Sequence, residues 1–555
     1  MKEFTNINRT EDFKKIDQKV YDLIVVGGGI TGAGIALDAA NRGMSVALFE
    51  MQDFAQGTSS RSTKLVHGGL RYLEHMEFAL VKAVGRERRI VHNNAMHIVW
   101  PEKMLLPIIE GGSLGEFTTS IALKVYDFLA EVEKTEKRKM LNLEETIQTE
   151  PLLKNPILKG GALYYEYKTD DSRLTIEALK KAIEFGAIAY NYAKVTNFLY
   201  DDNFQIKGGV VEDRINGKTI EIYGRYIVNA TGIWVDNLRK IDDTKANSRL
   251  HITKGIHIVI PRTKLPLNQA IYFDVGDNRM VFAIPRFDIV YIGTTDTNYT
   301  KELENPDIEK KDVQYLIDAV NKIVPTANLK LTDVKSAWSG LRPLIHQEGK
   351  APSELSRKDE IFYSETGLIS IAGGKLTGYR LMAKKIVDIV AARYKKDYNK
   401  NFGKCQTQKI KLAGGEFNFN YSAIKLADFA DKLYDTTKQT GISVEDFKRL
   451  FYRYGTNTEK IIEKAYEFYN QSKDSKQAWL KAEVWYSVNF EATTCLTDFF
   501  IRRTGLIFFL IDRIPPLIES VADYMEEMLN WTKQQRQTAI EQINKEIANS
   551  TNFKN

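Results

Sequence analysis

The sequence predicts an α/β fold with a Rossmann-like domain, an antiparallel β-sheet domain and a C-terminal all-helical cap. Three observations support this. Near the N-terminus, the apolar run Leu23 to Val26 is followed at once by Gly27-x-Gly29-x-x-Gly32 and an Ala-rich stretch. Between His251 and Asp296, short apolar runs alternate with proline and glycine turns. Beyond about Gly403 the pattern is helical only. Strand, tight turn and helix in this order are typical of a dinucleotide-binding βαβ unit.

Composition limits the classes of function. A chain of 555 residues is too long for one core and predicts two or three domains. A net charge of +6 argues against nucleic-acid binding, but is compatible with an anionic substrate or membrane surface. The two cysteines, Cys405 and Cys495, predict neither a disulfide framework nor a metal site and favour a cytoplasmic location. No apolar run reaches the ~18 residues of a membrane span, so we expect any membrane contact to be peripheral.

The first glycine motif predicts a phosphate-binding turn. Gly27 would permit the tight turn, Gly29 the close approach of a pyrophosphate, and Gly32 the packing of helix on strand. The next apolar run, Met44 to Phe49, ends in Glu50, eighteen residues after Gly32, where a ribose-binding carboxylate is expected. A structural βαβ turn is the alternative. The motif alone does not distinguish NAD from FAD.

Two later stretches repeat the strand, turn and helix pattern. In Arg225 to Asp236 the strand ends in Ala230-Thr231-Gly232, and in Gly367 to Arg380 it ends in Gly373-Gly374-Lys375-Leu376-Thr377. Small residues at the carboxyl ends of strands lie where nucleotides bind in open α/β sheets, so the second turn favours FAD. The helix after the third turn would direct its positive end at the flavin. An ordinary β-turn-α corner is the alternative for the second turn.

The stretch Asp53 to Leu73 is dense in hydroxyl and glycine residues, which are costly to order unless they bind something. A flexible surface loop is the alternative. We expect further helices at Phe78 to His92, Phe117 to Met140, Leu174 to Phe185 and Asp312 to Val324, and strands at Pro101 to Ile109, Ala187 to Val195, Ile256 to Ile260, Gln269 to Phe273, Arg279 to Pro285 and Ile289 to Thr294. The expected domains are a nucleotide-binding domain in three parts (1–95, 151–248 and 346–402), a cover (96–150), an antiparallel substrate sheet (249–345) and the helical cap (403–555).

The segment Thr58 to Glu74, taken with the upstream glycine turn, closely resembles the FAD-dependent, aerobic glycerol-3-phosphate dehydrogenase family, which is related to alpha-glycerophosphate oxidase. Asp170-Asp171-x-Arg173 and Asp498 to Gly505 also match that family. The resemblance and the glycine turns together give FAD as the cofactor. The expected FAD contacts are Gly27, Gly28, Gly29, Thr31, Gly32, Glu50, Ser59, Ser60, Lys64, Leu65, Gly69, Val195, Ala230, Thr231, Gly232, Gly374 and Thr377.

The substrate implied by this resemblance is sn-glycerol 3-phosphate. A phosphate dianion needs fixed cations, and the planar fork of arginine suits it well. The candidates are Arg71, Arg342 and Lys375, and Tyr72 would assist by hydrogen bonding. Oxidation of the alcohol also needs a base, for which the resemblance favours His257. Strand alternation directs His257 away from Ile256 and Ile258. A satisfied core histidine is the alternative for His257, and His67 is the competing base.

The resemblance implies oxidation of sn-glycerol 3-phosphate to dihydroxyacetone phosphate, with hydride passing from C2 to flavin N5 and electrons passing on to membrane quinone. The alternative is an oxidase that uses oxygen and releases hydrogen peroxide. The short connection after Leu341-Arg342-Pro343-Leu344-Ile345 favours the dehydrogenase, because the related oxidases carry a long insertion there. More distant alternatives are an NAD-dependent Rossmann enzyme and a non-catalytic flavin-binding module.

Family analogy also suggests a homodimer attached peripherally to the cytoplasmic face of the membrane. Arg502, Arg503, Leu506 to Leu510 and Arg513 could form a basic, apolar docking face. A buried helix with charged ends is the alternative interpretation of this segment.

Overall fold

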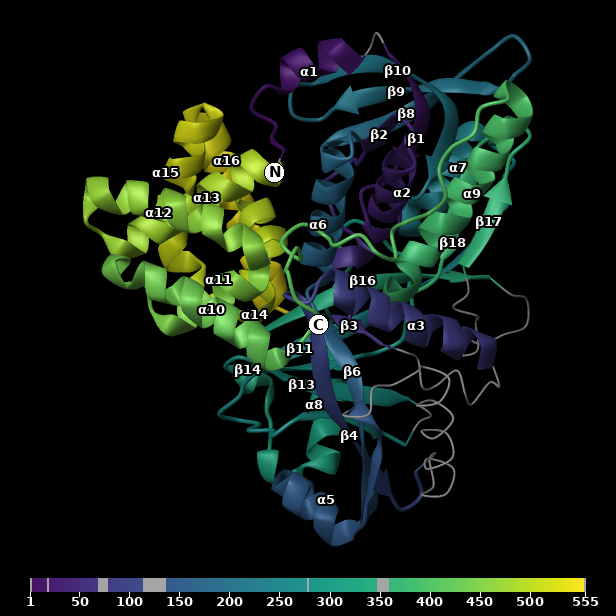
Figure 1. Ribbon diagram of the computed structural model, residues 1–555. Coiled ribbons are helices and arrows are strands. Elements are labelled where there is room, and N and C mark those ends of the chain that lie inside the picture. Colours follow the sequence, from purple (N-terminus) through teal and green to yellow (C-terminus); the bar gives the residue numbers. More distant parts are fainter. Residues whose placement is uncertain are drawn as a thin grey trace.

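The computed structural model describes residues 2–16, 19–67, 78–112, 136–276, 279–346 and 359–553. Figure 1 shows three regions: one sheet with α2 and α9 against it, a second sheet with α8 and α5, and a group of C-terminal helices beside both. The predicted fold class is confirmed by this arrangement.

The first sheet contains the predicted nucleotide-binding strands in the order β17-β18-β10-β1-β2-β7, with β9 and β8 extending antiparallel from β10. Its strands are β1 (Val20–Val26), β2 (Val46–Phe49), β7 (Ile188–Tyr190), β8 (Ala193–Tyr200), β9 (Ile206–Asp213), β10 (Lys218–Asn229), β17 (Asp359–Tyr363) and β18 (Ile369–Gly373). The pairs β1/β10, β1/β2, β10/β18 and β2/β7 are parallel. Three sequence-distant parts of the chain therefore form one sheet.

Helices cover this sheet because its strands are apolar on both faces. On one face, α2 (Ile30–Asn41) packs between α6 (Asp171–Glu184) and α9 (Tyr379–Tyr398), within a core that includes Leu23, Val25 and Val228. On the other face, α1 (Arg9–Ile16) contributes Phe13 and Ile16 to a second core. The short α7 (Val235–Asp242) follows β10, and α3 (Phe78–Asn94) contacts the turn before α9.

The second sheet is mainly antiparallel, in the order β15-β11-β14-β13-β12-β4-β6-β3, with β16 paired to β11 and β5 to β6. Its one parallel pair in the described chain is β12/β4. Its strands are β3 (Leu65–Val66), β4 (Val99–Ile109), β5 (Lys139–Leu141), β6 (Leu158–Thr169), β11 (Leu250–Pro261), β12 (Ala270–Asp274), β13 (Met280–Arg286), β14 (Ile289–Gly293), β15 (Thr297–Asn298) and β16 (Ser336–Ile345).

The second sheet lies between two cores. On one face, α8 (Lys310–Ile323) packs on Ile256, Ile258 and Ile260 of β11. On the other face, Trp338 and Tyr291 pack against C-terminal residues, including Phe508. The helix α5 (Leu143–Thr149) packs on β6 at the far end of this sheet.

The C-terminal region is helical from Ala423 onward, as its periodicity predicted, but residues 403–422, which were expected to be helical too, form turns and no helix. It contains α10 (Ala423–Thr437), α11 (Val444–Tyr454), α12 (Thr458–Ser472), α13 (Ser475–Phe490), a π-helical turn (Asp498–Arg503), α14 (Leu506–Phe509), α15 (Ile518–Leu529) and α16 (Lys533–Thr551).

Buried charges join this region to the rest of the molecule. Asp53, which follows β2, accepts hydrogen bonds from both Arg502 and Arg503. Arg173 of α6 pairs with Glu491 at 2.6 Å, and all five of these side chains are almost fully buried. Such pairs are sensitive to the loss of either partner, because the remaining charge is left in the interior.

The structure corrects several expectations. Arg502 and Arg503 do not form a docking face, because they are 2% and 0% exposed and pair with Asp53; the buried-helix interpretation is right for this part of the segment. Residues Lys139–Leu141 form strand β5, not the end of a helix from Phe117 to Met140, and 113–135 lie outside the described residues.

Two further expectations differ in their boundaries. The strand expected at Ala187 to Val195 is two strands, β7 and β8, because Tyr192 between them adopts φ +52°. The strand β6 lies in the second sheet, although the range 151–248 was assigned to the nucleotide-binding domain. Its pairing partner β4, more than 50 residues earlier, holds it there, and local sequence pattern carries no signal of that pairing.

Candidate active site

The first glycine turn has the close contacts that its motif requires. Gly27 adopts φ +115°, and a Cβ there would lie 2.5 Å from the carbonyl oxygen of Ala230. A Cβ on Gly32 would lie 1.9 Å from the carbonyl oxygen of Gly27. The strands β1 and β10 therefore end side by side, with Val26 opposite Asn229. This brings the first and second glycine turns together, at the N-terminus of α2, where the first N–H groups of a helix have no partner within it.

Two predicted cofactor residues border this turn. The Oγ of Ser59 accepts a hydrogen bond from the N–H of Ile30 at 3.0 Å, so the segment after Asp53 folds back over the start of α2. The carboxylate of Glu50 accepts from the N–H groups of Gly28 at 2.7 Å and Gln52 at 2.9 Å. Burial raises the pKa of Glu50, and these two N–H donors oppose the rise.

The other two turns leave space where a ligand could lie. A Cβ built on Gly232 or on Gly378 would meet no atom within 4 Å. Gly373 and Gly374 adopt φ +75° and +80°, a backbone conformation that favours glycine. The Oγ1 of Thr377 donates to the carbonyl oxygen of His67 at 3.0 Å, which joins the third turn to the Lys64 segment. Glycine turns with open space, beside a helix N-terminus, fit an extended dinucleotide such as FAD.

Further predicted cofactor residues have defined surroundings. Val195 lies on β8, which is held beside Glu50 by the N–H of Ala193 donating to the carbonyl oxygen of Glu50 at 2.7 Å. The Oγ1 of Thr231 donates to Asn229 at 2.7 Å. Leu65 begins β3, which pairs with β6. Thr31 lies in the first turn of α2 and is partly exposed.

Lys64 is held more tightly than a surface lysine. Its side chain is fully buried, and its ammonium donates to Asp171 at 2.7 Å and to the carbonyl oxygen of Ser60 at 2.8 Å. The same ammonium lies 4.1 Å from the ring centroid of Phe508. The Lys64 segment is thus fixed to α6 and to the C-terminal region. Asp171, at the start of α6, was noted in the sequence only as part of a matching pattern.

His257 and Arg342 lie on one face of the second sheet. In the antiparallel pair β11/β16, His257 is opposite Trp338, Gly255 is opposite Gly340, and Thr253 is opposite Arg342. Residues two apart on a strand and residues directly opposite each other share a face. The alternation predicted for His257 is thus observed: Ile256 and Ile258 pack toward α8, and His257 faces the other way.

Glycines shape the surface between His257 and Arg342. A Cβ on Gly255 would lie 2.6 Å from Nη2 of Arg342, so the guanidinium lies directly over this glycine. A Cβ on Gly340 would lie 2.2 Å from the carbonyl oxygen of Arg61. The segment Thr58 to Lys64, which borders the first glycine turn, therefore rests directly on the sheet. The Oγ1 of Thr58 also donates to the carbonyl oxygen of Leu341 at 2.8 Å.

Arg342 is held by residues that follow β14. Its Nη1 donates to Asp296 at 3.1 Å and its Nη2 to Oγ1 of Thr294 at 3.1 Å. The side chain of Arg342 is 23% exposed. Arg342 thus presents an oriented guanidinium at a partly open surface, which suits a phosphate.

The imidazole of His257 is 1% exposed and stacks on Trp338 with the ring centroids 4.8 Å apart. Its Nε2 is 2.9 Å from Oγ1 of Thr63, and within the described residues its Nδ1 has no hydrogen-bond partner. Burial lowers the pKa of His257 well below its ordinary value, and the cations of Arg342 and Lys64 lower it further. The ring is therefore neutral near pH 7.

The remaining predicted residues are placed less fully. Gly69, Arg71 and Tyr72 lie outside the described residues. Lys375 lies in the turn between β18 and α9 and is half-buried. Sequence reasoning assigned no role to Thr63, Asp171 or Thr294. Thr63 and Thr294 stand in runs of hydroxyl residues, and this was the only feature of the sequence that could have indicated a role for them. Their partners lie on strands that are distant in the sequence.

Comparison with known proteins agrees with this geometry. Residues 22–380 match the family described as FAD dependent oxidoreductase, and residues 405–536 match the C-terminal domain of alpha-glycerophosphate oxidase. The chain is 48% identical to the aerobic glycerol-3-phosphate dehydrogenase of Bacillus subtilis, over 98% of this chain and 97% of that protein. It is 47% identical to the protein of the same name from Staphylococcus aureus strain NCTC 8325, over 96% and 95%.

Solved structures show the same relationship. The glycerol-3-phosphate dehydrogenase of Bacillus halodurans, solved with FAD, superposes with a TM-score of 0.84 at 39% identity and covers 99% of this chain and 98% of its own. The FAD-bound L-alpha-glycerophosphate oxidase of Mycoplasma pneumoniae, at 19% identity and a TM-score of 0.56, shares the fold over 73% of this chain and all of its own. The chain therefore belongs to the FAD-dependent oxidoreductases and, within them, to the aerobic glycerol-3-phosphate dehydrogenase family.

Proposed function

We propose that this chain oxidises sn-glycerol 3-phosphate to dihydroxyacetone phosphate. FAD, bound along the three glycine turns, would take the hydride from C2 of the substrate at its N5. The names of the relatives and the match to an FAD-bound dehydrogenase support this substrate and this cofactor.

The observation that carries the proposal is the shared face of β11 and β16. It holds a cation, Arg342, and a neutral imidazole, His257, four residue pairs apart along the two strands. The Thr58 to Lys64 segment, which caps the cofactor turn, rests on the same face. A small phosphorylated alcohol needs one group to bind its phosphate and another to take its hydroxyl proton, and this face offers one of each beside the Thr58 to Lys64 segment.

Each residue then has a chemical role. Arg342 binds the phosphate, with Asp296 and Thr294 fixing the plane of its guanidinium. Lys375 adds a second positive charge from the third turn. His257 accepts the proton of the C2 hydroxyl, and Thr63 fixes the orientation of its ring through Nε2. Arg71 and Tyr72 remain proposed substrate contacts on the sequence match alone.

We further propose that the electron acceptor is a quinone and that the enzyme attaches peripherally to the membrane as a homodimer. The relatives are named dehydrogenases, and the connection between β16 and β17 spans only residues 346–358. No helix in the described ranges is long and apolar enough to span a bilayer. With Arg502 and Arg503 buried, any docking surface must use other residues.

The test is anaerobic addition of sn-glycerol 3-phosphate to the purified yellow protein, followed by flavin absorbance. We expect bleaching within the turnover time, and no bleaching with glycerol or with glycerol 2-phosphate. A flavin that stays oxidised with sn-glycerol 3-phosphate would overturn the proposal. Mixing the reduced protein with either a soluble quinone analogue or oxygen then tests the acceptor. Reoxidation that is faster with oxygen would favour the oxidase.

A further inference from the structure

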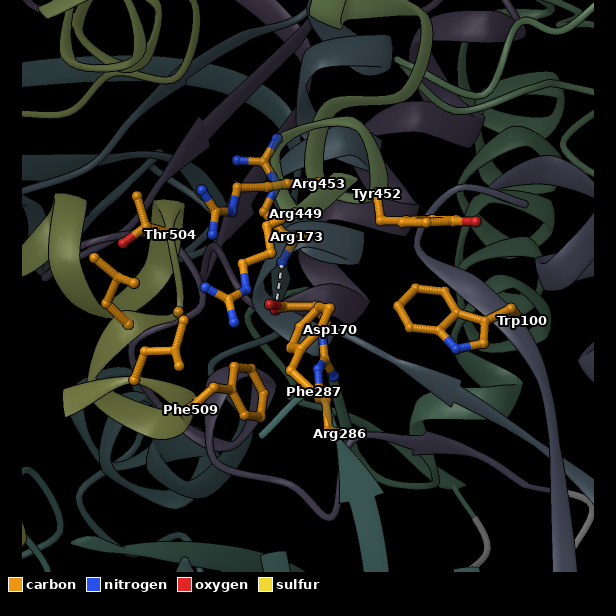
Figure 2. A pocket seen from close by; sticks show the side chains of 13 residues that line it. Trp100, Asp170, Arg173, Arg286, Phe287, Arg449, Tyr452, Arg453, Thr504 and Phe509 are labelled. Atoms are coloured by element: carbon orange, nitrogen blue, oxygen red, sulfur yellow. Dashed lines mark hydrogen bonds between the residues drawn. The ribbon is translucent and has the colours of Figure 1, made fainter. Parts of the chain in front are cut away.

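A pocket lies where the C-terminal helices meet the second sheet and α6 (Figure 2). Four arginines line it: Arg173 from α6, Arg286 from β13, and Arg449 and Arg453 from α11. One carboxylate, Asp170, lies among them. None of these residues belongs to the substrate or cofactor residues described above.

Arg173 and Arg453 pair closely with glutamate side chains. Arg173 pairs with Glu177 and Glu491, and Arg453 pairs with Glu483. These pairs fix the wall of the pocket and leave little binding capacity for a ligand.

Arg286 and Arg449 have unused donors, and the Nε of Arg173 likewise lacks an acceptor among the described residues. Arg286 is 7% exposed and donates through Nη1 to the carbonyl oxygen of Thr169 at 2.7 Å, but within the described part of the chain its Nε has no acceptor. Arg449 is also 7% exposed. Its Nη2 donates to Asp288 at 2.9 Å and to Glu445, and its Nη1 forms a longer ion pair with Asp446 at 3.6 Å. Its Nε and Nη1 still lack a hydrogen-bond acceptor among the described residues. Buried donors of charged groups rarely lack acceptors, and an unassigned ligand is one explanation for such groups.

Aromatic rings hold both guanidinium groups in place. The Cζ of Arg286 lies 4.0 Å from the ring centroid of Phe509, and the Cζ of Arg449 lies 5.3 Å from that of Phe287. Figure 2 shows Arg449 and Arg286 on opposite sides of Asp170. Two fixed guanidinium groups on different elements, β13 and α11, suit a compact anion with acceptor atoms in several directions, which is the geometry of a phosphate group.

Asp170 limits the choice of ligand. Its Oδ1 already accepts hydrogen bonds from the Oγ of Ser172 at 2.7 Å and from the N–H of Arg173 at 3.1 Å. Its charge opposes an incoming anion, so the ligand must engage both Arg286 and Arg449 to bind. A group with three or four acceptor oxygens does this more readily than a carboxylate with two.

We propose that this pocket, between Arg286 and Arg449, binds a phosphate group and thereby locks the C-terminal region onto the second sheet. The ligand would be inorganic phosphate or a phosphate monoester, including a lipid phosphate headgroup. This site is distinct from the proposed substrate phosphate site at Arg342, and the inference does not depend on the proposed reaction.

The test measures thermal unfolding of the FAD-loaded enzyme with inorganic phosphate at constant ionic strength. To remove binding at the substrate site, the measurements use an Arg342→Ala background. We expect 20 mM phosphate to raise the midpoint by about 2–4 °C. Arg449→Gln should abolish the rise, because it removes one fork. Arg536→Gln is the matched control: it removes an arginine of the same region that pairs with Glu519 and Asp523 and should leave the rise unchanged.

The source of the phosphate is distinguished by parallel samples. Glycerol 2-phosphate tests a soluble monoester, and vesicles of phosphatidic acid, whose headgroup is a phosphate monoester, against vesicles of phosphatidylcholine test a lipid headgroup. Protection by soluble phosphate assigns the site to a free ligand, and protection by anionic vesicles alone assigns it to a lipid. The proposal would be overturned if no sample raises the midpoint of thermal unfolding, or if the midpoint rises equally in Arg449→Gln. If Arg449→Gln does not fold, Arg449→Lys keeps the charge but loses the fork and should weaken phosphate binding about tenfold.

Discussion

The ammonium of Lys64 lies 2.7 Å from Oδ1 of Asp171, and both side chains are fully buried. This pair joins the segment beside the cofactor turn to the start of α6. Asp171 also accepts hydrogen bonds from the N–H and the Oγ of Ser62. The contact therefore positions the loop that reaches Thr63 and His257.

Breaking the Lys64–Asp171 pair should destabilise the protein. Asp171→Asn keeps the size of the side chain but leaves a buried ammonium without its counter-charge, which costs about 3–5 kcal/mol. We expect a clear fall in the thermal midpoint of the FAD-loaded protein. The double variant Lys64→Met, Asp171→Asn should lose less than the sum of the two single variants. Additive losses would contradict a direct pair.

Arg342 should determine substrate affinity. Removing a fixed guanidinium that binds a phosphate should raise KM by about 100-fold in Arg342→Ala, since such charge-assisted contacts contribute about 3 kcal/mol. FAD content, measured by absorbance, should stay unchanged. Release of FAD would mean that Arg342 supports the cofactor instead.

Gly255→Ala tests the same site without changing any charge. The added Cβ would lie 2.6 Å from Nη2 of Arg342 and 2.5 Å from Oγ1 of Thr294, so the guanidinium must move. We expect KM to rise about tenfold with FAD content unchanged. Steady-state kinetics at saturating acceptor measures this. An unchanged KM would show that the observed position of Arg342 is not required for binding.

His257 should affect the chemical step and its pH dependence. His257→Gln should lower kcat by about 10²- to 10⁴-fold, the usual contribution of a general base. Because the pKa of His257 is lowered by burial and by nearby cations, the acid limb of kcat/KM should lie below pH 6.5. Arg342→Gln removes one of those cations and should shift this limb to higher pH. If the acid limb does not move, the group that titrates there is not His257.

Acid should weaken the junction with the C-terminal region. The cations of Arg173 and Lys180 outweigh burial and lower the pKa of Glu491 from 4.5 to about 2. A carboxylate whose pKa is lower in the folded state stabilises the fold above pH 4.5, and this stabilisation is lost as the pH falls from 4.5 towards 2. Glu491→Gln should be less stable at pH 7 and lose less stability over that interval. Urea midpoints from pH 7 to 3 measure the difference, and parallel curves would contradict it.

Much of the nucleotide-binding half could be predicted from local pattern. The three glycine turns, the strands before them and the orientation of His257 follow from short-range rules on backbone conformation and alternation. The family resemblance added the names of site residues, among them Arg342 and Lys375. The C-terminal helices followed from periodicity, but their contacts did not. Arg502 and Arg503 look like surface charges in the sequence, and only the buried Asp53, some 450 residues earlier, explains them.

The sequence by itself determined the fold class, the three glycine turns and the residue types available for a phosphorylated alcohol, because these depend on local backbone geometry and on chemistry carried by short motifs. Only the tertiary structure decided which charges face the site and which are buried. The register of β11 against β16 brings Arg342 over Gly255, and α6 supplies Asp171 to Lys64. Such pairings form between strands and helices that are distant in the sequence. The contacts that stabilise them therefore cannot be inferred from any short stretch of residues.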